Sequence, residues 1–446
     1  MALTTSVEAL RHRQFRRVWL GGLVSQIGNW MQITGRAALI YEATGSTAAL
    51  GTIYFLSYLP QLLLSQFAGV VADRFDRRRV LIAGQVAATG GSVMMAVLAL
   101  TDSATVATVG AVSVAVGLAQ ATSMPAQQAM VPSLVPRESL TSAITLNSAT
   151  QAATRVFGPL LAGLVFETLG LPWLFWINSA SFGVIIFVWA TTHVPRQPPM
   201  AETRTFAAIA AGFRFVRSQP ALLVAMATTL VIAGIGNMYQ PLGVAFTTDV
   251  LAGGASGRGT TYYTYLQAAL GAGAFVGILG VADLAKRRPA LAIVASSTGV
   301  ALGLIALGQV GSLGPALAVG FVIGATHFAT NTLVLNVIQH RTPDEMRGRV
   351  LALHSVGFVG MLPLISISGG WLAESFGIAA TLTGAGVVCL AYCVPLIRWS
   401  RHLPSSTLED RPGDTLERVA AAIAEEEGAG PPIERPSGPA APAPTT

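Results

Sequence analysis

The stretch GVVADRFDRRRVL, residues 69–81, connects the end of one long apolar run to the start of the next, and a cluster of charged residues lies between the two runs. A related stretch, VADLAKRR, occupies residues 281–288. Three more pairs of stretches match at nearly the same spacing: 28–32 with 236–240, 51–54 with 259–262, and 136–138 with 343–345. Four collinear matches predict an internal repeat, and hence two similar halves.

Twelve apolar runs surround these stretches, each about long enough to cross a bilayer as a helix. They cover about 15–41, 46–72, 78–101, 104–131, 139–166, 171–192, 220–247, 259–282, 289–309, 312–338, 350–373 and 377–398. The runs lack the period-two alternation of barrel strands. We therefore expect an all-α membrane protein with twelve transmembrane helices in two six-helix, pseudo-symmetric bundles, an architecture typical of secondary transporters.

The composition of the 446 residues supports this class. Charged residues make up 11%, against about 25% in soluble proteins. This excludes a disordered protein, a nucleic-acid-binding domain and a disulfide-stapled secreted domain. The two cysteines, Cys389 and Cys393, lie one helical turn apart in an apolar run and lack the further ligands that a metal site needs.

The basic residues orient the predicted helices. Of the 27 Lys and Arg residues, 24 fall at the N-terminus, in alternate loops or after the last apolar run. This positive-inside bias predicts that both termini are cytoplasmic. The N-terminus lacks the pattern of a cleaved secretory signal. We expect a multi-pass protein of the bacterial cytoplasmic (inner) membrane.

The same features divide the chain into four parts. Residues 1–192 form an N-terminal six-helix bundle, and residues 220–399 form a C-terminal one. Residues 193–219 form a cytoplasmic linker in which phenylalanines and arginines alternate, so we expect an interfacial helix there. Residues 400–446 form an acidic Pro/Ala-rich tail that we expect to be disordered.

The opening stretch also resembles the loop 2–3 signature of the major facilitator superfamily, and this resemblance extends over about residues 10–400. Asp76 stands in place of the usual Gly, and Val71 in place of the usual Leu. In that family the motif forms a charge clasp that latches the two halves in the outward-open state. The resemblance implies this conformational gate for Gly69, Asp73, Arg74, Arg77 and Arg78, with Asp283, Lys286 and Arg287 in the equivalent loop of the second half.

Two further stretches, MPAQQAMVP at 124–132 and TPDEMRGRV at 342–350, resemble the enterobactin-exporter and macrolide/multidrug-efflux branch of this superfamily. Gly158, Pro159 and Gly163 partly match the exporter motif of the fifth helix. The Arg typical of the fourth helix in drug/proton antiporters is absent, and Gln120 and Gln127 occupy the polar positions. This resemblance implies an antiporter that exports a drug-like or siderophore-like compound.

Polar residues recur at helical spacing within the apolar runs, where they are costly unless they face protein or water. We expect these stripes to line the substrate cavity: Asn29, Gln32, Arg36, Tyr54, Tyr58, Gln61, Gln120, Asn147, Gln151, Arg155, Asn237, Gln240, Tyr263, Gln267, His327 and Asn331. Each Asn, Gln or Tyr could instead make an interhelical hydrogen bond. A buried guanidinium cannot deprotonate, so Arg36 and Arg155 suggest an electropositive cavity for anionic or phenolate-bearing solutes.

Proton coupling would need a titratable group, for which the candidates are Glu42, Asp73, His327 and His354. We find no nucleotide-binding loop, catalytic constellation, cofactor motif or metal site, and expect a non-enzymatic monomer. The leading hypothesis is proton-coupled export of a small amphipathic compound by alternating access, with the solute, protons and the lipid bilayer as partners and no nucleic acid. Uptake or facilitated transport of a small organic solute remains open, as does a non-transporting membrane receptor or scaffold.

Overall fold

The computed structural model describes residues 8–64, 76–192, 206–281 and 288–400. These residues form helices joined by short turns, and no strand occurs among them. Eleven of the helices are long and apolar enough to cross a membrane. A twelfth long helix, α2 (Arg13–Thr44), has 32 residues and carries three arginines at its start. The predicted all-α fold is confirmed.

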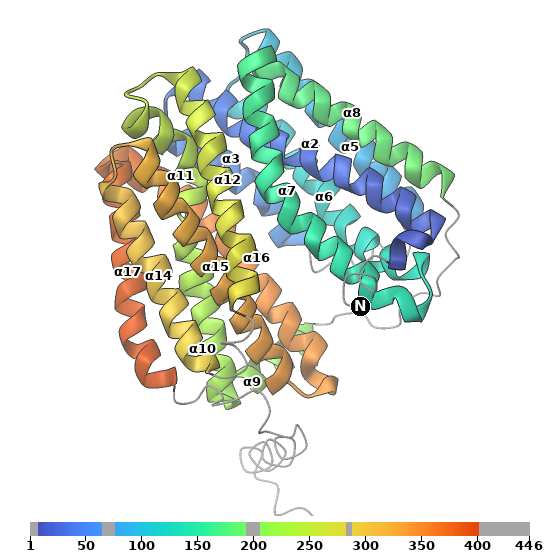
Figure 1. Ribbon diagram of the computed structural model, residues 1–446, viewed down its shortest axis with the longest axis vertical. Helices are drawn as coiled ribbons and strands as arrows, with labels where there is room; N and C mark the ends of the chain where they lie inside the picture. Colours follow the sequence, from blue (N-terminus) through green and yellow to red (C-terminus); the bar gives the residue numbers. More distant parts are fainter. Residues whose placement is uncertain (1–7, 65–75, 193–205, 282–287, 401–446) are drawn as a thin grey trace, which may run out of the picture.

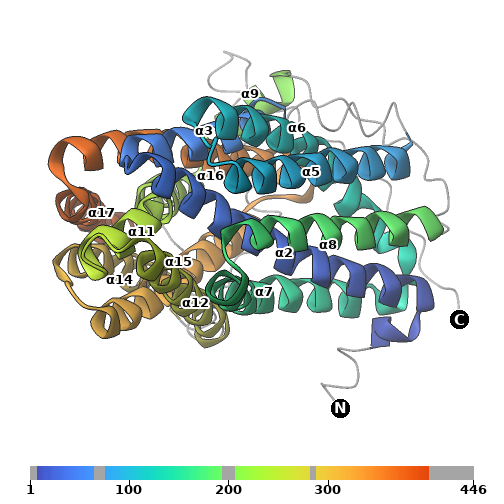
Figure 2. The same cartoon turned by 90° about the horizontal axis from the view of Figure 1, so that it is seen from above.

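The helices form two bundles that lie side by side in Figure 1, and in Figure 2 they meet where α16 lies beside α3. The first contains α2, α3 (Thr47–Leu64), α5 (Arg77–Leu100), α6 (Val106–Met130), α7 (Leu140–Leu169) and α8 (Leu171–Thr191). The second contains a composite seventh span, α12 (Ser256–Gly280), α14 (Pro289–Gln309), α15 (Leu313–Arg341), α16 (Asp344–Phe376) and α17 (Ile378–Trp399).

The seventh span, Pro220–Leu251, is irregular where its counterpart α2 is a continuous helix. It runs through α10 (Pro220–Thr228), a π-helical turn (Thr229–Gly234), a 3-10 turn (Ile235–Asn237), α11 (Tyr239–Ala245) and a second π-helical turn (Phe246–Leu251). Pro241 has no backbone N–H to donate to the preceding turn, which weakens regular helical bonding there. The two halves of the repeat therefore differ at the level of backbone structure.

The bundles meet along two helix pairs, α3 with α16 and α7 with α12. Glycines bring both pairs close together. A Cβ on Gly51 would lie 3.0 Å from the Cα of Gly370, and a Cβ on Gly271 would lie 2.8 Å from the carbonyl carbon of Arg155. Small residues allow such close backbone approach between membrane helices.

The two ends of the molecule differ in charge. At one end, called here the Glu374 end, α2 finishes at Gly45 (φ 62°) and α16 finishes at Gly377 (φ 87°). The opposite end, called the arginine end, carries Arg13, Arg288 and other basic residues at the starts or ends of helices. The described residues thus retain the alternation of charge seen in the sequence.

A short helix, α9 (Phe206–Ser218), lies within the linker between the bundles. Its Phe215 and Val216 are buried against the C-terminal bundle, and Gly212 faces Arg349 of α16. The expected helix is therefore present, and part of its apolar face packs on protein. Its position at a membrane interface stays a prediction.

Candidate functional site

Two arginines from the N-terminal bundle lie among aromatic rings near the junction of the bundles. Arg36 on α2 is 8% exposed, and its guanidinium carbon lies 5.8 Å from the centre of the Tyr54 ring. The guanidinium of Arg155 on α7 lies 4.2 Å from the ring centre of Phe328, on α15 of the other bundle, and 6.0 Å from that of Trp30. Aromatic faces attract such cations.

Neither guanidinium forms a hydrogen bond or an ion pair with any residue that the structure describes. His327 lies beside Phe328 with ring centres 5.6 Å apart, and Tyr239 lies edge-on to His327 with ring centres 6.1 Å apart. Removing a charge from water is costly unless an opposite charge or hydrogen bonds compensate. Cation–π contacts supply only part of that compensation, and an anionic solute group would supply more.

Tyrosines from both bundles meet beside these arginines. The hydroxyls of Tyr54 and Tyr263 are 3.3 Å apart across the junction, and Gln267 donates to the Tyr263 hydroxyl at 3.2 Å. Tyr58 stacks near Tyr54, with ring centres 6.4 Å apart. This cluster of side chains, called here the arginine–tyrosine chamber, consists of Arg36, Arg155, Tyr54, Tyr58, Tyr239, Tyr263, Gln267 and His327. Seven of the eight were predicted to line the cavity; Tyr239 was not among them.

At the Glu374 end, carboxylates hydrogen-bond across the junction. Glu374 on α16 accepts from the backbone N–H of Thr47 at 2.9 Å, from its hydroxyl at 2.9 Å and from the Ala48 N–H at 3.2 Å. Ser46 Oγ donates to the same carboxylate oxygen at 3.2 Å. Glu374 therefore caps the N-terminus of α3 from the opposite bundle, where a negative charge is favourable.

Two more carboxylates join the bundles near Glu374. The Tyr41 hydroxyl donates to Asp249 at 2.5 Å, and the Thr260 hydroxyl donates to Glu42 at 3.2 Å. With the Tyr54–Tyr263 contact, these bonds close the junction from the Glu374 end down to the arginine–tyrosine chamber. The sequence alone does not tell which residues these carboxylates contact; the fold brings each of them to a partner in the other bundle.

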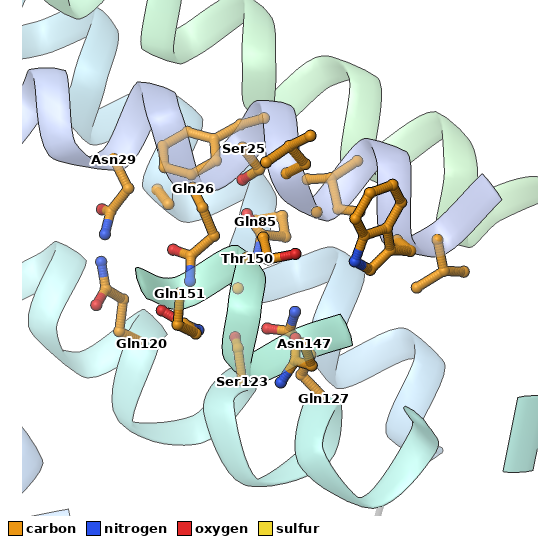
Figure 3. A pocket seen from close by; sticks show the side chains of 18 of the residues that line it. Ser25, Gln26, Asn29, Gln85, Gln120, Ser123, Gln127, Asn147, Thr150 and Gln151 are labelled. Atoms are coloured by element: carbon orange, nitrogen blue, oxygen red, sulfur yellow. The ribbon is translucent and has the colours of Figure 1, made fainter. Parts of the chain in front are cut away.

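A cavity lies inside the N-terminal bundle, on the arginine-end side of these residues. It has a volume of about 210 Å³ and is lined by residues of α2, α5, α6, α7 and α8. Figure 3 shows its polar side chains gathered from α2, α5, α6 and α7 around one space. The predicted residues Asn29, Gln120, Asn147 and Gln151 line it. Trp19, Gln26 and Gln85 also line it, although we did not predict them as cavity residues.

The other predicted cavity residues have separate surroundings. Gln32 is buried and accepts a hydrogen bond from Asn178 of α8, so it holds two helices of one bundle together. Asn237 donates to Gln240 at 3.2 Å within the seventh span. Gln61 and Asn331 are partly buried. Gln32 therefore makes the interhelical hydrogen bond that was the alternative to a place in the cavity.

Most of the predicted gate lies outside the described residues, namely Gly69, Asp73, Arg74, Asp283, Lys286 and Arg287. Arg77 begins α5. Arg78 donates from Nε to the carbonyl oxygen of Trp189 at 2.8 Å and also bonds the carbonyl of Ala190. It thereby fastens α5 to the C-terminal end of α8, where a cation is favourable. The charge clasp itself stays a prediction.

The residues of the exporter-like motif serve helix packing in α7. A Cβ on Gly158 would lie 3.1 Å from Cδ1 of Trp30, and a Cβ on Gly163 would lie 3.2 Å from Cβ of Thr264 in the other bundle. Pro159, which follows Gly158 in the sequence, is also buried. Gly163 therefore lets α7 approach α12 directly beside the junction.

The candidates for proton coupling do not form a relay among the described residues. His327 is 3% exposed, lies edge-on to Tyr239 with ring centres 6.1 Å apart, and has no partner for Nδ1. His354 stacks near Phe358, and its Nε2 has no partner. Glu42 bonds Thr260 as described above. Asp73 lies outside the described residues.

Comparisons with known proteins agree with this architecture. A family model described as "Transmembrane secretion effector" (MFS_3) matches residues 4–429. The enterobactin exporter EntS of Escherichia coli (strain SMS-3-5 / SECEC) is 25% identical over 422 residues, covering 90% of this chain and 96% of the relative. The EntS of Shigella boydii serotype 18 is 26% identical over the same shares.

Solved structures share the fold at low sequence identity. A mutant of the nucleoside transporter NupG superposes with a TM-score of 0.72 at 10% identity, covering 86% of this chain and 99% of NupG. A bacterial homologue of the human lysosomal transporter Spinster, inward-facing and occupied, gives 0.69 at 15% identity over 89% and 98% of the two chains. The twelve helices, the two bundles and the match over residues 4–429 thus establish that this chain belongs to the transmembrane secretion effector family of major facilitator transporters.

Proposed function

We propose that this transporter exports a small amphipathic compound that carries an anionic or phenolate group, in exchange for protons. The observation that carries the proposal is the pair Arg36 and Arg155, held among aromatic rings at the junction of the bundles without a carboxylate partner among the described residues. A solute anion at this point would offset the cost of two desolvated positive charges. The aromatic rings would hold the apolar part of the same compound.

The relatives support the direction and the class of solute. Proteins that match this chain over nine-tenths of its length carry the name enterobactin exporter. We therefore infer export of a siderophore-type compound, with enterobactin as the first compound to test. The chain itself contributes the electropositive chamber, which favours anions over cations.

The geometry of the two ends supports alternating access. Hydrogen bonds across the junction occur at the Glu374 end, through Glu374, Asp249 and Glu42. The positive-inside rule assigns the arginine end to the cytoplasm. We infer that this conformer is closed to the outside and takes solute from the cytoplasm, and that transport requires these carboxylate contacts to break.

Proton exchange is the energy source that we propose. Glu42 is the candidate that lies in one of these contacts, where it accepts from Thr260 of the other bundle. A carboxylate that gains a proton becomes a weaker acceptor, because charge-assisted hydrogen bonds are the stronger kind. Protons arriving from outside would thus favour opening at the Glu374 end.

The test is flux of radiolabelled enterobactin in proteoliposomes with an imposed pH gradient. We expect gradient-dependent movement that falls at least tenfold in Arg155→Leu and Arg36→Leu. Arg258→Leu changes an exposed arginine at the Glu374 end and serves as the matched control. Movement of an anionic and a cationic dye that is equally intact in Arg155→Leu would overturn the anion site, and no gradient dependence with folded protein would overturn proton exchange.

A further inference from the structure

The cavity inside the N-terminal bundle differs chemically from the arginine–tyrosine chamber. Among the described residues that line it, none is ionisable. Seven carboxamide side chains and three hydroxyls supply its polar surface. A site built to hold an ion would present an opposite charge or a focused set of donors. This lining suits groups that are polar and uncharged.

The polar side chains of the cavity retain unused hydrogen-bonding capacity. None of the seven carboxamides forms a side-chain hydrogen bond with another described residue. Gln85 Oε1 and Trp19 Nε1 are both buried from solvent and have no partner. One is an acceptor and the other a donor. Each carboxamide of the lining can donate and accept, so the cavity suits a guest that does both.

The remaining wall is apolar and aromatic. Phe15, Phe182 and Ile185 lie on the same cavity, with Trp19 contributing its ring. A surface that combines carboxamides with aromatic rings fits an amide, a hydroxylated ring or a similar neutral group attached to apolar carbon. The volume of about 210 Å³ exceeds the roughly 30 Å³ share of one water several-fold.

The cavity lies within reach of the arginines. Gln151 lines the cavity and Arg155 lies four residues further along α7, a rise of about 6 Å along a helix. Asn29 and Arg36 are seven residues apart on α2, a rise of about 10 Å. One solute of modest size could therefore contact the cavity and the chamber together.

We propose that this amide-lined cavity is a second subsite that binds the uncharged, hydrogen-bonding part of the transported compound, while the arginines bind its anionic part. This proposal rests on the proposed function, because it assumes that the transported compound passes the arginines and this cavity. It makes a separate claim about chemistry: the cavity admits neutral polar molecules in preference to ions of either sign.

Cysteine labelling tests this claim in the full chain. The two native cysteines, Cys389 and Cys393, are free and buried, and their replacement by alanine gives a background without reactive thiols. S25C then places one thiol on the cavity. S218C, on an exposed part of α9, normalises for intrinsic reactivity. S297C, fully buried in the other bundle, reports nonspecific reaction.

Three methanethiosulfonates of similar size are compared on purified protein in detergent: 2-hydroxyethyl (neutral), sulfonatoethyl (anionic) and trimethylammonioethyl (cationic). We expect the neutral reagent to react with S25C at least tenfold faster than either ion, relative to S218C. A smaller ratio for either ion, or no reaction with the neutral reagent, overturns the proposal. T150C, at a buried position on the same cavity, repeats the measurement if S25C does not fold.

Two further arms tie the result to the cavity. Gln85→Glu adds a carboxylate to the cavity. It should raise the rate of the cationic reagent relative to that of the anionic reagent at S25C but not at S218C. If this ratio of rates at S25C does not change, the thiol is reached by another route and the proposal is overturned. Benzamide should slow labelling of S25C more than benzoate does, and equal protection also overturns it. Selective labelling without solute flux would refute only the proposed function, and flux without selective labelling would refute only this subsite.

Discussion

Replacing Glu374 should loosen the closed end of the transporter. In the observed conformer this one carboxylate accepts hydrogen bonds from Ser46, Thr47 and Ala48, which begin α3 in the other bundle. Loss of a helix N-cap costs about 0.5–2 kcal/mol. The carboxylate is exposed, so solvent screening reduces its contribution, and we take about 1 kcal/mol. Glu374→Ala should therefore raise the population opened at this end about fivefold relative to the closed one.

Spin labels at Thr44→Cys and Ser375→Cys, both exposed and on opposite bundles, can measure this shift. Double electron–electron resonance, in the background without native cysteines, gives the fraction of molecules with the longer distance between the two labels. Glu374→Gln retains a neutral acceptor and should shift the population less than Glu374→Ala does. Glu167→Ala removes an exposed carboxylate from the end of α7 and is the matched control. An equal shift in Glu167→Ala and Glu374→Ala would refute the reasoning.

Three further perturbations follow from the junction. Arg155→Lys keeps the charge but loses the planar group that lies over Phe328, and we expect the apparent affinity for an anionic dye to fall three- to tenfold in a flux assay. Tyr54→Phe removes the hydroxyl that meets Tyr263 and should raise the open fraction about two- to fivefold, measured with the same spin labels. Gly163→Leu should lower transport at least tenfold by separating α7 from α12, whereas Gly183→Leu, which meets open space, should leave it within twofold.

Each of these three has an outcome that contradicts it. Unchanged dye affinity in Arg155→Lys would mean that charge alone matters at this site. An unaltered open fraction in Tyr54→Phe would mean that the tyrosine contact does not hold the bundles together. Normal flux in Gly163→Leu, with folded protein, would show that the junction tolerates a larger gap between α7 and α12.

The sequence alone determined the class of fold, the number of long helices and the alternation of charge between the two ends. Each of these depends on local properties: the length and hydropathy of one segment, or the basic residues beside it. The repeat added the division into two halves. The sequence also identified Arg36 and Arg155 as unusual, because a guanidinium within an apolar run is costly wherever the helix packs.

Only the tertiary structure decided which polar residues act together. Gln32 follows the same helical stripe as Arg36, yet it pairs with Asn178 inside one bundle. Gln85 looked unremarkable in the sequence and lies unpaired in a cavity. Glu374 gave no local signal and caps a helix more than 300 residues away in sequence. Such partners depend on how separate helices pack against each other, and the period of a single helix carries no information about that.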